Sequence, residues 1–231
     1  MKTFFNRLSE LMPADVSLSV LLAFLIADLF VFQPIEALSG WAKLLVDIVT
    51  VTGIVLSILA VLGLQRATCI FMVLAGGALL LRGLRLAMPE IGVGYLQSAL
   101  SLVAIGILAC LVLKLVLRSG RVTIHRIQGA VVVYLLLAMM WTQAYRMIVL
   151  YDPAAFVLTD EVSRIDPDIN SKIGLFSFSV LTAASFIDMT PINPIARSLA
   201  MLEALTGQLY LVILIARLVS LEVEAKRAGD R

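Results

Sequence analysis

Three polar side chains stand out because they lie in a short loop between two apolar segments near the end of the chain. Thr182 and Ser185 bring hydroxyl groups and Asp188 a carboxylate to this loop, which covers residues 182–191 and overlaps an apolar stretch at 173–184. Hydroxyls, backbone carbonyls and carboxylate rings bind or attract cations when several subunits present them around one axis. The loop is therefore a candidate site for cations.

Composition indicates a membrane protein. Of the 231 residues, 61% are hydrophobic and 15% are charged, and the mean hydropathy is +1.03. Soluble domains average about 45–50% apolar and about 25% charged residues. The net charge of +2 is too small to indicate nucleic acid as a partner.

Other chemistry is not indicated. Cys69, Cys110 and the lone His125 are scattered, whereas a metal site needs clustered donors. The chain contains no His-Glu-x-x-His, Ser-Lys or paired-carboxylate arrangement with suitable neighbours. We therefore expect neither an enzyme nor a cofactor or metal site.

Six apolar segments approach the length of about 20 residues that a membrane-spanning helix needs. They cover residues 16–38, 44–64, 69–88, 91–117, 127–151 and 195–221. Lysine and arginine are more frequent on one side of these segments, 11 against 7, when the N-terminus is placed inside. The sequence predicts an all-α, multi-pass protein with both termini in the cytoplasm.

The stretch 173–184 is too short to span a bilayer. Irregular backbone at membrane depth is tolerated only when it is buried in protein or lines water. One subunit cannot enclose such a loop alone, so we expect a closed ring of identical subunits whose loops meet on the axis. The order helix, polar segment, short helix, loop and helix predicts a re-entrant pore loop between the fifth and sixth spanning helices.

These segments resemble a known family. Residues 176–191 are similar to the pore helix and selectivity filter of bacterial potassium channels, 194–217 to the inner helix, and 124–130 to the start of the outer helix. The resemblance implies a homotetramer in a bacterial inner membrane, with a pore domain at 121–231. Residues 1–120 would form a four-helix domain in the position of a voltage sensor, similar to the family only in number and position of helices.

The filter departs from the family pattern Thr-Val-Gly-Tyr-Gly-Asp. The matching residues, after Thr182, are Ala183, Ala184, Ser185, Phe186, Ile187 and Asp188. The two family glycines allow left-handed backbone, which Ser185 and Ile187 resist at about 1–2 kcal/mol per residue. A ladder of carbonyls of the family type is not expected, and neither is selectivity for potassium.

Several roles stay open. Asp188 either faces ions or is bonded within its own loop, and the acidic segment before the short helix either attracts cations or is an ordinary solvated loop. That segment contains Asp152, Asp160, Glu161, Asp166 and Asp168, against Arg164 and Lys172. On the last helix, Gly207 is either a gating hinge or a site of close packing. Gln208 is expected to line the cavity, and Glu203 to face protein, against the short helix.

The fourth apolar segment carries Lys114, with Arg118 beyond its end, and no ladder of arginines, so voltage gating is not expected. The function indicated is a tetrameric, potassium-channel-like cation channel that passes monovalent or divalent cations through lipid membranes without potassium selectivity. The alternative is a non-conducting channel homologue with a structural or regulatory role.

Overall fold

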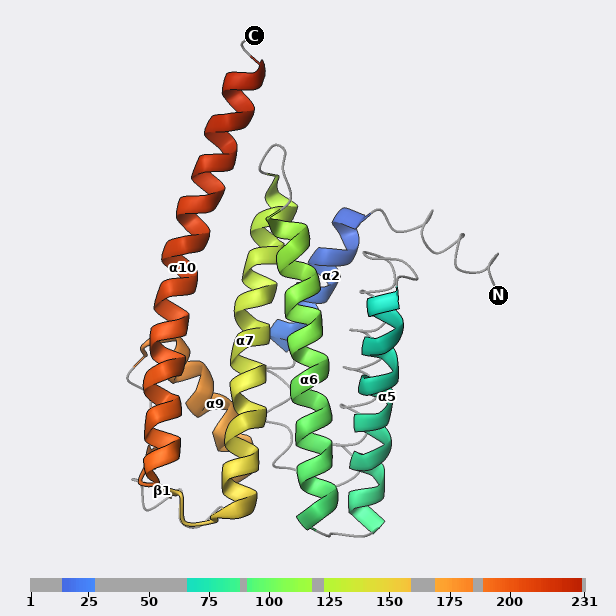
Figure 1. The fold of residues 1–231 in the computed structure, drawn as a ribbon, viewed down its shortest axis with the longest axis vertical. Helices are drawn as coiled ribbons and strands as arrows, with labels where there is room; N and C mark the ends of the chain where they lie inside the picture. Colours follow the sequence, from blue (N-terminus) through green and yellow to red (C-terminus); the bar gives the residue numbers. More distant parts are fainter. Residues whose placement is uncertain are drawn as a thin grey trace, which may run out of the picture.

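The computed structural model describes residues 14–27, 66–87, 91–117, 123–158, 169–184 and 189–229, and within them the protein is mostly helical. Its elements are α2 (Ala14–Ala27), α5 (Arg66–Ala87), α6 (Ile91–Val116), α7 (Ile124–Tyr151), β1 (Phe156–Leu158), α9 (Ile169–Thr182), β2 (Met189–Pro191) and α10 (Pro194–Gly229). Figure 1 shows α5, α6, α7 and α10 as long rods, with α9 beside the lower parts of α7 and α10.

Three described helices are long and apolar enough to cross a membrane: Gly92–Val116, Ile124–Tyr151 and Pro194–Val223. They coincide with the fourth, fifth and sixth predicted spans. The third predicted span is the 22-residue helix α5, which is not among the three and contains Arg66, Arg82 and Arg85. The first predicted span is described only over α2, and the second, 44–64, lies outside the described residues.

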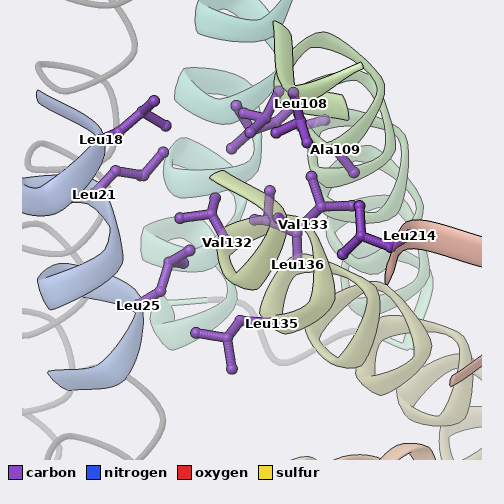
Figure 2. Close-up of a cluster of buried hydrophobic side chains, with 14 of the residues drawn as sticks. Leu18, Leu21, Leu25, Leu108, Ala109, Val132, Val133, Leu135, Leu136 and Leu214 are labelled. Atoms are coloured by element: carbon purple, nitrogen blue, oxygen red, sulfur yellow. The ribbon is translucent and has the colours of Figure 1, made fainter. Parts of the chain in front are cut away.

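One hydrophobic core joins the N-terminal helices to the rest of the chain. Figure 2 shows Leu18, Leu21 and Leu25 of α2 on one side of this core, with side chains of α6 and α7 opposite. Leu214 of α10 completes it. The predicted boundary at 120/121 therefore runs through a shared core, because α6 and α7 lie on opposite sides of that boundary and pack against each other over their lengths.

A second core lies at the end of α7 that leads into β1. Its buried residues are Tyr145, Val149, Ala155, Phe156, Ile173, Phe176, Met189 and Ala196. They come from α7, the turn into β1, α9, β2 and α10, so this core is the one that fixes the segment between the last two spanning helices. The rings of Tyr145, Phe156 and Phe176 meet edge to face, with centroids 5.2–5.9 Å apart, an arrangement favoured by the quadrupoles of aromatic rings.

β1 and β2 form a two-stranded antiparallel sheet in which Val157 is opposite Thr190. Residues 33 positions apart in the chain are thereby paired, so the segment between them leaves and returns at the same end of α7 and α10. Figure 1 places β1 at this end, well away from the C-terminus. Among the described residues, the predicted order of long helix, short helix and long helix is present as α7, α9 and α10.

Candidate functional site

The short helix α9 begins near the paired strands and ends between α7 and α10, beside Gly207 of α10. Its 14 residues extend about 21 Å, less than the roughly 30 Å of a hydrocarbon core. At its C-terminal end, the carbonyl oxygen of Leu181 accepts a hydrogen bond of 2.9 Å from the hydroxyl of Tyr134, on α7. The same carbonyl lies against Gly207, near the middle of the span Pro194–Val223.

Gly207 permits this contact between α10 and α9. It is buried, and a Cβ atom placed on it would come 2.2 Å from the Leu181 carbonyl oxygen. A backbone carbonyl cannot rotate away as a side chain can, so only glycine fits here without a shift of one helix. The structure thus supplies a packing reason for Gly207, and its role as a gating hinge stays a prediction.

The chain leaves α9 through a Schellman motif. The amide of Ala183 donates to the Val180 carbonyl at 3.1 Å, and the amide of Ala184 donates to the Ser179 carbonyl at 2.9 Å. Ala183 has a φ of 54°, in the left-handed region where this motif usually has glycine. A residue with a Cβ atom pays about 1–2 kcal/mol for that conformation. Ala183, the first residue matched to the family filter pattern, therefore has strained backbone at the end of α9.

Thr182 is exposed, and its hydroxyl donates to the Phe178 carbonyl of its own helix at 2.7 Å. The oxygen keeps lone pairs that can face a cation. Of the predicted filter, the structure describes Thr182, Ala183 and Ala184, at the C-terminal end of α9. The remaining positions, Ser185, Phe186, Ile187 and Asp188, lie outside the described residues.

At the end of the loop that leads into β2 and α10, hydrogen bonds from side chains hold the ends of α7 and α10 together. Asp152 accepts hydrogen bonds from the Ala154 amide at 3.1 Å and from Nδ2 of Asn193 at 3.0 Å. Asn193 in turn accepts from the Ile195 amide at 2.9 Å and so caps the start of α10. Arg197 donates through Nε to the Pro191 carbonyl at 2.9 Å. Asp152, counted in the sequence among the acidic residues of this segment, ties the end of α7 to the start of α10.

The other acidic residues of that segment, Asp160, Glu161, Asp166 and Asp168, lie outside the described residues, so the predicted attraction of cations there stays a prediction.

A fully buried carboxylic group joins α10 to both neighbouring helices. Glu203 has no exposed surface, and the hydroxyl of Tyr145, on α7, donates to its Oε2 at 2.7 Å. Its Oε1 lies 2.5 Å from the hydroxyl oxygen of Ser177, on α9, which is also 2.8 Å from the Ala138 carbonyl oxygen of α7. The prediction that Glu203 faces protein against the short helix is confirmed. Its partners were not predicted, since a single Tyr and a single Ser in apolar segments give no signal of pairing.

A second polar contact links α7 and α10 farther along. The hydroxyl of Tyr210 donates to the Ala130 carbonyl at 2.8 Å, and the rings of Tyr134 and Tyr210 stack with centroids 5.8 Å apart. Gln208, predicted to line a cavity, is exposed on the other side of α10. These contacts orient α10 so that Gly207 and Glu203 face α9 while Gln208 faces away from the subunit.

The outward surface of α10 is largely apolar. Only 17% of the residues in its most apolar stretch are buried, against 44% for α7. The exposed residues include Met201, Leu202, Leu205, Leu209, Val212, Ile213, Ile215 and Val219. A surface this apolar on so much of one helix requires lipid, another subunit or both to cover it.

Comparisons with protein-family models, with curated proteins and with solved structures found no match for this chain.

Proposed function

We propose that the chain is one subunit of a tetrameric cation channel, of the potassium-channel-like type, whose altered filter does not select potassium. The observation that carries this proposal is the course of α9 between α7 and α10. It starts beside the paired strands at one end of α7 and α10 and ends against Tyr134 and Gly207, and the chain then returns to β2 at the starting end. A re-entrant pore loop would follow such a path.

The need for several subunits follows from this path. Thr182 and Ala183 are exposed in the single subunit. If α7 and α10 span a bilayer, these two residues would lie in its hydrocarbon interior. Irregular backbone there must be covered by protein or by water. A closed ring of four subunits, with the loops on its axis, would provide both, and the apolar outward surface of α10 would lie between subunits and lipid. The proposal places the protein in a bacterial inner membrane with both termini in the cytoplasm.

Cations are favoured by the direction of α9. The C-terminal end of a helix carries roughly half a negative charge. In the proposed arrangement, α9 would point this end toward the middle of the bilayer. Four such ends around one axis would lower the energy of a cation in the membrane. The Thr182 hydroxyls, and the Ser185 and Asp188 side chains of the predicted filter, would add further oxygen atoms on the outer side.

Weak selectivity follows from the residues at the glycine positions of the family filter, Ser185 and Ile187. Without glycine-like backbone at these positions, an ion would meet hydroxyls and fewer carbonyls. Such groups discriminate less sharply between hydrated ions, so sodium should pass if potassium does.

The test is a reversal potential in a planar bilayer that contains the purified protein, with potassium on one side and sodium on the other. We expect a value near zero. A value close to the Nernst potential of potassium would contradict the backbone argument. No current for either ion, with folded tetramers present, would favour a non-conducting homologue.

A matched variant replaces residues 183–187 by Thr, Val, Gly, Tyr and Gly. If the surrounding helices are competent, this change should create selectivity for potassium. The fourfold assembly is tested separately, by native mass spectrometry in detergent. A monomer or dimer as the only species would contradict the proposed ring.

A further inference from the structure

Glu203 is buried without a basic partner. Its exposed surface is zero, and both of its hydrogen-bonding neighbours are hydroxyl groups, from Tyr145 and Ser177. Among the described residues, no Lys, Arg or His pairs with it. Of the ionisable side chains in the described part of the chain, Tyr145 and Tyr134 interact with it, both on α7, while α9 presents Ser177, which does not titrate. An ionised carboxylate that is fully buried and bonded only to hydroxyl groups is costly, because hydroxyl groups do not neutralise its charge.

The protons around Ser177 can be counted. Its hydroxyl oxygen lies within hydrogen-bonding distance of two other oxygens, the Ala138 carbonyl at 2.8 Å and Oε1 of Glu203 at 2.5 Å. A serine hydroxyl carries one hydrogen, and a backbone carbonyl can only accept. If Ser177 donates to Ala138, the contact with Glu203 needs a hydrogen from Glu203.

We infer that Glu203 is an uncharged carboxylic acid that donates its proton to the hydroxyl oxygen of Ser177 and so positions α9. The bonds then form a directed relay: Glu203 donates to Ser177, and Ser177 donates to the Ala138 carbonyl. The other carboxyl oxygen accepts from Tyr145. Each of the three donors has one acceptor, and each link joins two different helices, so the relay holds α9 between α10 and α7 without burying a charge.

This inference does not depend on whether the channel conducts. It concerns the protonation of one residue at neutral pH, which is read by spectroscopy on the folded protein. Failure of the proposed channel activity would leave it unaffected, and its own failure would not bear on conduction.

The experiment is infrared difference spectroscopy of the reconstituted full-length protein at neutral pH. The spectrum of Glu203→Gln is subtracted from that of the unmodified protein. We expect the difference spectrum to show the C=O stretching band of one protonated carboxylic acid, present in the unmodified protein and missing in Glu203→Gln. A difference spectrum that instead shows loss of carboxylate bands would overturn the inference.

Two further variants sharpen the test. Glu222→Gln, at a partly exposed glutamate near the end of α10, is the control and should leave the acid band unchanged. Ser177→Ala removes the acceptor, so the acid band should move to the higher frequency of a more weakly bonded acid. An acid band that does not move in Ser177→Ala would refute donation to Ser177, and it does so even if Glu203→Gln fails to fold.

Discussion

Replacing Gly207 by alanine adds one methyl group at the point where α10 touches the end of α9. The new Cβ atom would lie 2.2 Å from the Leu181 carbonyl oxygen, 3.0 Å from its Cδ1 and 3.1 Å from its carbonyl carbon. A normal contact needs more than 3 Å, so α9 or α10 must shift by about 1 Å or more. The carbonyl also accepts the Tyr134 hydrogen bond, and a shift would weaken that bond as well.

Two effects of opposite sign set the magnitude. Alanine is intrinsically better than glycine in a helix by about 0.8–1.0 kcal/mol. Overpacking usually costs about 1–3 kcal/mol, and the upper part of that range applies here because the obstacle is backbone. Loss of the Tyr134 bond adds about 1 kcal/mol. We expect a net destabilisation of about 2–3 kcal/mol, which lowers the midpoint of thermal unfolding by about 4–12 °C for a chain of this size.

The measurement is the midpoint of unfolding of the purified protein in detergent, by circular dichroism. Gly76→Ala on α5 is the matched control, because a Cβ atom on Gly76 would meet no atom of the described residues within 4 Å. That variant should be as stable as the unmodified protein or slightly more stable. If Gly207→Ala behaved like Gly76→Ala in unfolding, the packing argument would be wrong. A changed channel opening with unchanged stability would then favour the hinge.

Three further variants or measurements test other parts of the structure. Voltage dependence should be shallow, because α6 carries Lys114 as its one basic residue; a gating charge of several elementary charges per subunit would contradict this. Ala183→Gly should raise stability by about 1 kcal/mol, since glycine adopts a φ of 54° without strain; an unfolding midpoint that falls would show that Ala183 is not strained. Tyr145→Phe should cost about 1–3 kcal/mol because Glu203 loses a buried donor, whereas Tyr151→Phe, at an exposed position, should cost nothing; equal midpoints would refute the difference.

The apolar pattern predicted the long helices well because lipid exposure and helix length both follow from it. The predicted segments 91–117 and 127–151 differ by at most three residues from α6 and α7. The apolar pattern predicts the sixth spanning segment at 195–221, whereas α10 continues to Gly229. The extra residues are mostly Glu, Ala, Lys and Arg, good helix formers, so the helix outlasts the apolar stretch from which its end was judged.

The contacts of the candidate site could not be predicted in the same way. β1 and β2 have three residues each and pair across 33 positions, so no local periodicity marks them. The sequence predicts backbone strain at Ser185 and Ile187, whereas among the described residues it is Ala183 that has left-handed backbone. An alanine does not indicate such backbone in a sequence. Glu203 was recognised as buried against the short helix, but its link to Tyr145 depends on how α7 and α10 cross.

The shared core beneath α2, α6 and α7 limits how this protein can be recombined. In a modular membrane protein, the N-terminal helices could be exchanged for those of another protein by joining two genes between the domains. Here a junction at 120/121 would separate Leu108 and Val112 from Val132 and Leu136, which are buried together. A foreign N-terminal half would have to reproduce the same apolar surface before α7 could fold against it. We therefore expect the buried residues on the two sides of this boundary to be substituted together, both in engineered variants and in evolution.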